Sequence, residues 1–365
     1  MSQPKYQYPH VEIDLGKLKE NLAALQERCQ ASSIELCGVV KGFHALPEMA
    51  KVYERAGLSS IASSRLDQLQ GLREAGIRAP LMLIRIPMPC EAEEAVKWSD
   101  ISLNSEISVL RLLNEAAQRQ GKVHQVILMV DLGDLREGFW DWDELVAAAV
   151  EVERDLPGLK LLGVGTNLGC YGSIQATPEK MRDLVAAAET VEVAIGRKLE
   201  VISGGASSSL HMVLDGTMPP RVNHLRVGEA ILLGGIWGCQ MDFMHKDICI
   251  LRAQVIESKV KPSKPVGELS VDAFGRTRTY VDRGHRLRCL LAMGRVDYGE
   301  SDDLIPREPG IKVLGASSDH TILDVEGAVQ RLQVGDILEF DLCYATMVYL
   351  TGSKSVHVYY KQDAE

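Results

Sequence analysis

The first two thirds of the chain alternate between two hydrophobic patterns. Short apolar runs, typical of buried parallel strands, are each followed by a longer stretch with apolar residues at helical spacing. We expect strands at 11–15, 36–40, 59–64, 80–85, 100–104, 124–131, 159–167, 199–205 and within 224–234. Strands that alternate with helices predict a parallel sheet. Because the units are short and even, they favour a (β/α)8 TIM-type barrel over an open sheet.

The helices expected between these strands cover 16–30, 47–57, 66–76, 90–99, 105–121, 140–155 and 177–196, with a short helix beginning in 207–209. Ser105 is the expected N-cap of the helix over 105–121, with Glu106 in its first turn. The pattern contains one strand more than an eight-stranded barrel needs. We therefore expect the first run, 11–15, to pair with a second domain.

The pattern changes beyond about residue 240. Long helical stretches disappear, and short β-rich runs separated by turn residues take their place. The expected strands are 248–260, 278–282, 288–293, 311–314, 320–325, 336–342, 347–350 and 355–360. The prediction is a barrel domain over 1–240, with 1–15 pairing with the second domain, and a mostly antiparallel β domain over 241–365.

Composition narrows the class of protein. The chain has 365 residues, 46% of them hydrophobic and 25% charged, as in an ordinary soluble globular protein. Its net charge of -10 argues against binding to nucleic acid or to an anionic membrane. The 8 cysteines are scattered without zinc spacing. We therefore expect reduced thiols, no metal site and a cytoplasmic location. Neither a signal peptide nor a membrane-spanning run is apparent.

Lys41 stands where the apolar run 36–40 ends. Burial of an ammonium is costly, so a lysine seldom occupies the end of a buried strand for packing alone. A desolvated amine is a nucleophile toward carbonyls, which favours a Schiff base with a carbonyl compound. The structural alternative is a lysine whose side chain reaches out of the barrel mouth to water.

Other polar residues follow the carboxyl ends of the expected strands, where the active sites of such barrels form. They are Asp131, Asp134, Arg136, Thr166, Asn167, the run 203–207 and Arg226. Each also has a structural explanation: the aspartates and Ser207 as helix caps, and Arg226 as a surface partner of Glu229. A functional site is favoured because all of these polar residues are expected at the same end of the barrel.

The chemistry of this set suits a phosphorylated aldehyde. The small residues of 204–207 enter a helix and expose backbone N–H groups to an anion such as phosphate. A further glycine, Gly228, follows the last strand, Lys41 reaches a carbonyl, and arginines are available for a ring. Pyridoxal phosphate meets all of these requirements.

Six segments carry a resemblance to a known family. The chain resembles the alanine-racemase-type (fold type III) pyridoxal-phosphate enzymes, and within them the ornithine/lysine (basic amino-acid) racemase group. The segments are 39–41, 129–138, 203–209, 225–229, 271–275 and 315–320. They follow one another in order over nearly the whole chain.

The resemblance implies a set of roles in the barrel. Lys41 binds the cofactor covalently, Arg136 approaches the cofactor O3′ and the substrate carboxylate, and Arg226 faces the pyridine nitrogen. The other implied cofactor-binding residues are Asn167 in the place of a ring-stacking histidine, Ser203, the phosphate-binding Gly205, Ser207 and Gly228, and Tyr344 from the second domain. Because an arginine only donates hydrogen bonds, the pyridine nitrogen must accept, and the ring becomes a weaker electron sink.

The resemblance also implies roles for the second domain. Ser318, Asp319 and His320 lie where relatives bind the substrate carboxylate, and an acid there also suits the ammonium of an ornithine or lysine side chain. Relatives keep a catalytic tyrosine in a stretch that matches 294–299, but this chain has Arg295 in that slot. Asp297 and Tyr298 are therefore candidate second bases, and the alternatives are a base at Cys170 or Tyr171 or a one-base mechanism with Lys41 alone. The family also implies a homodimer with active sites shared between the subunits.

The expected function is racemisation of a free amino acid, ornithine or lysine, by removal of its α-proton. Alternatives within the same fold type are a basic amino-acid decarboxylase and an alanine or broad-specificity racemase. The three-glycine phosphate loop and the second-domain cysteine motif of the decarboxylases are absent. An alternative of another class is a non-catalytic pyridoxal-phosphate-binding protein. Such proteins are single barrels, so residues 241–365 argue against it.

Overall fold

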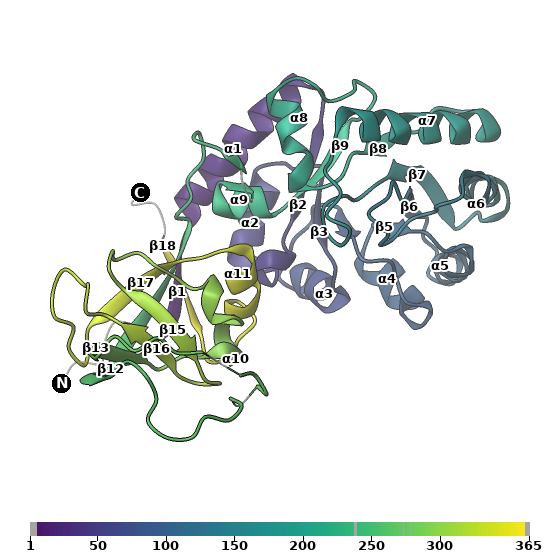
Figure 1. Ribbon diagram of the computed structural model, residues 1–365. Helices are drawn as coiled ribbons and strands as arrows, with labels where there is room; N and C mark the ends of the chain where they lie inside the picture. The colour runs from purple at the N-terminus through teal and green to yellow at the C-terminus, as the bar shows by residue number, and fades with distance from the viewer. Residues whose placement is uncertain (1–5, 237–238, 273, 278, 362–365) are drawn as a thin grey trace. The chain divides into compact units, whose positions relative to one another are not determined.

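The computed structural model describes residues 6–236, 239–272, 274–277 and 279–361 (Figure 1). The chain divides into two compact units. The barrel unit comprises Lys17–Lys246, and the β unit comprises Met1–Gly16 together with Asp247–Glu365. Within the described residues, none of the helices is long and apolar enough to cross a membrane.

Eight parallel strands of the barrel unit close into a barrel, in chain order and with helices between them. The strands are β2 (Glu35–Val39), β3 (Ser60–Ser63), β4 (Leu81–Leu83), β5 (Ile101–Asn104), β6 (His124–Met129), β7 (Leu159–Gly165), β8 (Val201–Ser203) and β9 (His224–Val227). The helices are α1 (Leu15–Ala31), α2 (Pro47–Arg55), α3 (Leu66–Glu74), α4 (Ala92–Trp98), α5 (Ile107–Arg119), α6 (Trp142–Asp155), α7 (Pro178–Ile195), α8 (Leu210–Leu214) and α9 (Glu229–Leu233). The predicted TIM-type barrel is confirmed.

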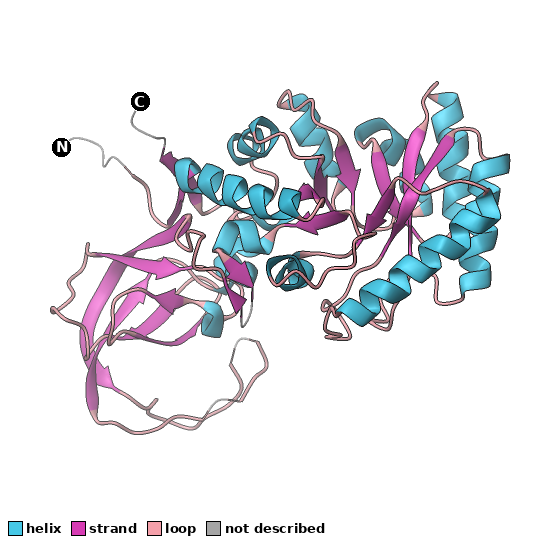
Figure 2. Cartoon of the chain, turned by 90° about the horizontal axis from the view of Figure 1, so that it is seen from above, coloured by secondary structure: helices cyan, strands magenta, loops and turns pink. Residues whose placement is uncertain are grey.

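The barrel strands are mostly buried because they are covered on both sides. Every residue of β3, β5 and β9 is buried, and the helices lie around the outside of the strands (Figure 2). Side chains from β2 to β7 form one buried cluster: Cys37, Val39, Ala62, Met82, Ile101, Leu103, Ile127, Met129 and Leu162. Continuous apolar runs, rather than alternating ones, are what a parallel strand in this position requires.

The helix starts follow local capping chemistry, with one exception to the prediction. The Asp141 side chain accepts the N–H of Asp143 at 2.7 Å, as an N-cap does. Ser105, by contrast, is not the cap that the sequence predicts. The helix α5 begins at Ile107 after Glu106, whose backbone is extended and whose side chain makes no capping bond. The acidic residue therefore lies outside the helix.

The β unit is built on a sheet whose strands run in the order β14-β17-β12-β13-β16-β15, each pair antiparallel. The strands are β12 (Cys249–Pro262), β13 (His285–Leu291), β14 (Ile305–Pro306), β15 (Lys312–Ala316), β16 (Thr321–Asp324) and β17 (Ile337–Asp341). Buried positions alternate along β12 and β17, so the sheet has one covered face. The predicted antiparallel second domain is confirmed.

The first strand of the chain, β1 (His10–Asp14), belongs to this sheet and not to the barrel. It pairs antiparallel with β12 and parallel with β18 (His357–Lys361). Residues 1–5, the start of the segment expected to join the second domain, lie outside the described residues. The short strands β10 (Gly235–Ile236) and β11 (Cys239–Gln240) form a separate pair in the barrel unit.

The prediction of two strands in the β unit is wrong. Residues 347–350 belong to the helix α11 (Tyr344–Leu350), which buries Thr346, Met347 and Leu350 at helical spacing. A short apolar run has no period that separates strand from helix. Residues 279–282 of the other run have no strand structure, and Tyr280 and Val281 are exposed. Arg278, which opens that run, lies outside the described residues.

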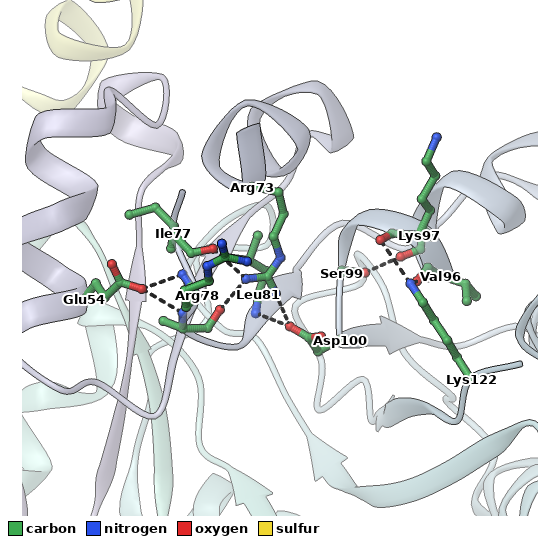
Figure 3. A network of polar contacts seen from close by, with 12 residues as sticks. Glu54, Arg73, Ile77, Arg78, Leu81, Val96, Lys97, Ser99, Asp100 and Lys122 are labelled. Atoms are coloured by element: carbon green, nitrogen blue, oxygen red, sulfur yellow. Dashed lines mark hydrogen bonds and ion pairs between the residues drawn. The ribbon is translucent and has the colours of Figure 1, made fainter. Parts of the chain in front are cut away.

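A polar network joins the loops at the amino-terminal end of the barrel (Figure 3). Arg73 donates to the carbonyl oxygens of Ile77 and Ala79 at 3.0 and 2.8 Å and pairs with Asp100. The same carboxylate accepts the N–H of Leu81, the first residue of β4, at 2.7 Å. These bonds fix the entry to β4 and β5 at the end of the barrel opposite the carboxyl ends of its strands.

Candidate functional site

Lys41 leaves the carboxyl end of β2 in a tight turn. It opens the 3-10 turn Lys41–Phe43, and the N–H of His44 closes it by donating to the Lys41 carbonyl at 3.2 Å. His44 and Ala45 then take φ values of 49° and 53°, in the left-handed region. The chain therefore turns sharply after Lys41, as the predicted position at a strand end requires.

The surroundings of Lys41 make its ammonium easier to deprotonate. Burial lowers the pKa of its ammonium, and the positive charges of Arg136 and Arg226 lower it further, while Cys170 and Glu137 oppose them. No hydrogen bond or ion pair within the described residues holds the Lys41 Nζ. A neutral amine is both a nucleophile and a base, which is what attack on a carbonyl and transfer of a proton need.

Arg226 is a buried cation with a fixed direction. It lies in β9 with 4% of its surface exposed. One Nη donates to the Ser203 Oγ, and the other donates to the Thr166 carbonyl at 2.8 Å. Among the residues that the structure describes, no carboxylate pairs with it. Burial lowers its pKa, yet an arginine stays protonated in proteins, so this site carries a permanent positive charge.

Ser203 connects Arg226 to His224. The Ser203 Oγ lies 2.8 Å from the His224 Nδ1. The tautomer of His224 decides the direction of this bond, because a hydroxyl that accepts from Arg226 can still either donate to Nδ1 or accept from it. Burial, together with the charge of Arg226, lowers the pKa of His224 to about 3. Arg226, Ser203 and the neutral His224 thus form one buried hydrogen-bonded chain.

The loops after β8 and β9 form an array of N–H groups. The Ser207 Oγ accepts the N–H groups of Gly228 and Ala230 at 3.4 and 3.3 Å. The N–H groups of Gly205 and Ala206 have no acceptor within the described part of the chain. Gly205 has a φ of 106°, which a residue with a side chain rarely adopts. An anion such as phosphate would meet several donors here.

Arg136 and Asn167 lie in the loops that follow the carboxyl ends of β6 and β7. The Asn167 Nδ2 is buried and lacks a partner among the described residues, so this amide is able to contact a bound group. The Arg136 guanidinium pairs through two bonds with Glu137, and its side chain is 40% exposed. Lys41, Arg136 and Arg226 interact electrostatically with one another, which makes the mouth suited to anionic groups.

Asp131 and Asp134 do not cap a helix. The Asp131 Oδ1 accepts the N–H groups of Gly133 and Leu135 at 2.8 and 3.1 Å, which folds the loop after β6 back on itself. Asp134 is buried, and its carboxylate bonds to the neighbouring loop after β7. Both aspartates therefore shape the mouth rather than a helix end.

The candidate second bases are both buried in the β unit. Asp297 and Tyr298 lie in the short helix α10 (Arg295–Tyr298). The Asp297 carboxylate accepts the N–H of Gly294 at 3.1 Å and the Ser353 hydroxyl at 2.9 Å. The Tyr298 OH lies 2.7 Å from the Thr321 Oγ1, and burial raises its pKa.

The candidate substrate-binding residues adjoin α10. Ser318, Asp319 and His320 form the turn between β15 and β16, and the Ser318 hydroxyl donates to Asp319 at 2.5 Å. The N–H of Arg295 donates to the Ser317 carbonyl at 3.0 Å, which ties this turn to α10. Tyr344 opens α11 of the same unit. The structure thus brings the second-domain candidates together within that unit.

The tyrosine slot of α10 is filled by a nearly buried arginine. Arg295 pairs with Glu300 and stacks over the Phe274 ring, with its guanidinium carbon 4.0 Å from the ring centre. Its Nη1 is buried without a partner in the described structure. Ala273, in the motif that precedes Phe274, lies outside the described residues.

Comparisons with known proteins agree over most of the chain. Residues 13–234 match the family described as "Alanine racemase, N-terminal domain". An ornithine racemase of Acetoanaerobium sticklandii is 38% identical over 343 residues, which cover 93% of this chain and 96% of that protein. A lysine racemase of Thermotoga maritima is 36% identical over 356 residues, which cover 97% and 99%.

The chain belongs to the alanine racemase family. The family resemblance and the amino-acid racemase activity expected from the sequence are thereby confirmed. The solved structure of alanine racemase from Clostridium difficile 630 has the same fold, with a TM-score of 0.73, 19% identity and coverage of 99% of this chain and 98% of that one.

Within this racemase fold, the site contains two residues that the sequence did not single out. His224 supports Ser203 beneath Arg226, and Glu137 pairs with Arg136. The sequence contains a feature that could have identified each of these two residues. His224 precedes Arg226 by two positions in one strand, so both point to the same side. Glu137 is the direct neighbour of Arg136, where a fork-to-fork pair is geometrically available.

Proposed function

We propose that this chain is a pyridoxal-phosphate-dependent racemase of ornithine or lysine that inverts the α-carbon by removing and returning its proton. The observation that carries the proposal is Lys41, an amine with a lowered pKa at the carboxyl end of a barrel strand beside two arginines. The ornithine and lysine racemases described above, similar along nearly their whole length, support the choice of a basic amino acid.

The residues at the mouth fit the cofactor. Lys41 would hold its aldehyde carbon, and the N–H groups around Gly205, Ser207 and Gly228 would hold the phosphate. The unpartnered Asn167 amide would contact the ring, and Ser203 would keep Arg226 directed at the ring nitrogen. When bound, the cofactor supplies an electron sink for the pair of electrons left on the α-carbon.

The chain's own groups then control the proton. The neutral Lys41 amine takes the α-proton on one face and returns one to it. Arg226 donates toward the ring nitrogen and withholds a proton from it, because a guanidinium does not deprotonate. Negative charge therefore stays near the α-carbon, where quick reprotonation competes with side reactions.

The substrate is held at both of its charged ends in this proposal. Arg136 would bind the α-carboxylate, and the turn of Ser318, Asp319 and His320 would complete the binding site. The Asp319 carboxylate suits the ammonium at the end of an ornithine or lysine side chain. Asp319 and its neighbours belong to the β unit, so a shared active site between two copies of the chain would bring them to the substrate.

We accordingly propose a homodimer with shared sites, working in the cytoplasm. Seven cysteines with described side chains are free thiols, which suits a reducing compartment. The second base is assigned to Asp297 or Tyr298, and the alternative is Cys170 or Tyr171 in the loop after β7. A two-base racemase needs its second acid on the face of the α-carbon opposite Lys41.

The test is incubation of the pure protein with D- or L-ornithine and with lysine, arginine and alanine in deuterated water. We expect inversion of ornithine or lysine with deuterium at the α-carbon. Carbon dioxide release would instead establish a decarboxylase, and no exchange with any of the four amino acids would contradict racemisation. Borohydride reduction and peptide mapping must place the cofactor on Lys41, and Lys41→Ala must lose both the label and the inversion.

The same assay separates the candidate second bases. A variant that lacks the second base exchanges the α-proton of one enantiomer without inverting it. Single substitutions of Asp297, Tyr298, Asp319 and His320 would be compared with substitutions of Cys170 and Tyr171. If the four β-unit variants all invert both enantiomers at the original rate, the second base lies outside that unit.

A further inference from the structure

One buried carboxylate joins two loops of the barrel mouth. We call its set of hydrogen bonds the clasp. Asp134 lies in the loop after β6 with 1% of its surface exposed. Its Oδ1 accepts the N–H groups of Gly169 and Ile174 at 3.0 and 3.2 Å. Its Oδ2 accepts those of Cys170 and Tyr171 at 3.2 and 3.0 Å. All four donors belong to the loop after β7, some 35 to 40 positions later in the chain.

The backbone of the two loops is joined as well. The N–H of Gly172 donates to the Asp134 carbonyl at 3.1 Å. A Cβ at position 172 would lie 2.8 Å from this carbonyl oxygen, so glycine allows the close approach. On the other side, the Ser208 hydroxyl donates to the Leu168 carbonyl at 3.1 Å. The loop 168–174 is therefore held between Asp134 and the residue that follows Ser207.

The held loop carries one side chain, that of Cys170, that interacts with the cationic residues of the site. Cys170 interacts electrostatically with Lys41, Arg136 and Arg226, and both Cys170 and Tyr171 are exposed. Asp134 also precedes Arg136 by two positions in its own loop. The carboxylate thus holds the backbone of Cys170 directly and lies in the same loop as Arg136.

The clasp is strong because it uses a charge. Burial raises the pKa of Asp134, but the four N–H groups outweigh it, and the pKa lies below its ordinary value. Hydrogen bonds to an ionised acceptor are stronger than those to a neutral one. An asparagine has the same shape but has an NH₂ in place of one oxygen, so two of the N–H groups would face a donor.

We propose that Asp134 is a positioning residue of the racemase site, whose carboxylate fixes the loop 168–174, and with it Cys170, next to Lys41. This inference rests on the proposed function for its catalytic consequence, but its structural part stands by itself. Removal of the clasp should loosen the loop and slow turnover while leaving the cofactor attached to Lys41.

The experiment compares Asp134→Asn with wild type by hydrogen exchange of the amides in 168–174 and by kinetics. We expect exchange of these amides to rise about tenfold or more, since charge-assisted bonds are lost. We expect kcat to fall by about tenfold or more, with less change in KM, because the loop orders the reacting groups. The borohydride label on Lys41 should remain.

Glu192→Gln is the matched control, since Glu192 is another buried barrel carboxylate that accepts a backbone N–H, from Leu199 at 3.0 Å. It should lower stability without changing exchange in 168–174 or kcat by more than about twofold. If Asp134→Asn does not fold, Gly172→Ala disturbs the same contact from the opposite loop and should give the same results.

Unchanged exchange in the folded variant, or faster exchange with unchanged kcat, would overturn the inference. If wild type racemises nothing but Asp134→Asn still loosens the loop, the proposed function fails while the clasp stands. In that case Asp134 orders the loop but positions no racemase chemistry.

Discussion

At the scale of single residues, Arg226 combines a permanent charge with a fixed direction. Its two hydrogen bonds, to the Ser203 hydroxyl and to the Thr166 carbonyl, leave the guanidinium little rotational freedom. The neutral His224 is hydrogen-bonded to the same Ser203 hydroxyl, which holds that hydroxyl in place. In the proposed racemase, this arrangement delivers an N–H, and never a transferable proton, to the ring nitrogen.

Substitution Arg226→Glu should reverse that property. A buried carboxyl whose pKa is raised by desolvation can give a proton to the ring nitrogen, which strengthens the electron sink. We expect racemisation to fall about a hundredfold or more, and transamination to pyridoxamine phosphate to increase, measured by chromatography of the released cofactor.

The matched variant is Arg226→Gln, which keeps a donor but lacks both the charge and an acidic proton. It should slow racemisation without raising transamination. If Arg226→Glu forms no more pyridoxamine phosphate than wild type, then Arg226 does not control the ring nitrogen.

At the scale of elements, the residues that stabilise the barrel and those of the proposed active site lie at opposite ends of its strands. The network of Arg73, Asp100 and the loop before β4 lies at the amino ends of the strands, while Lys41, Asn167 and Arg226 follow or occupy their carboxyl ends. Changes at the amino end are therefore expected to affect unfolding more than turnover.

The variant Arg73→Ala tests this separation. It removes two bonds to backbone carbonyls and one ion pair, and we expect it to lower the free energy of unfolding by about 1–3 kcal/mol. Urea unfolding would measure the loss, and kcat/KM for the preferred amino acid should stay within about twofold of wild type. A tenfold loss of kcat/KM in the folded variant would show that the two ends are coupled.

The elements also show what the sequence can predict. The barrel strands were predictable where burial on both faces gives a continuous apolar run, as in 36–40 before Lys41. Lys41 was predictable because it interrupts such a run at its end. The helix over residues 347–350 was not, since four apolar residues fit either period. The bonds of Asp134 to the loop 168–174 join segments far apart in sequence, and no local pattern indicates them.

At the scale of the whole molecule, the proposed shared sites give a test with two inactive proteins. One is Lys41→Ala, which lacks the amine. The other is a β-unit variant that is inactive by itself, such as the one identified by the second-base assay. When the two are denatured, mixed and refolded together, hybrid dimers form in which one site has an intact Lys41 and an intact partner β unit.

About a quarter of wild-type activity should return in an equal mixture, because half of the dimers are hybrids and each contains one good site of two. Separately refolded proteins, mixed afterwards, are the control and should stay inactive. If co-refolded samples are also inactive while hybrids are present by mass spectrometry, each subunit builds its site from its own residues.

The position of β1 has a consequence for the order in which this chain becomes complete during synthesis. The barrel strands and the helices between them lie within one continuous stretch of the chain, so they are able to fold before β12 and β18 have been made. β1 emerges before all of them, yet its partners β12 and β18 emerge after the barrel, and β18 ends at Lys361. β1 is therefore able to pair with β12 first, but its other edge has no partner until β18 has been made, so a nascent chain that stops before His357 leaves that edge of β1 open to pairing with another chain.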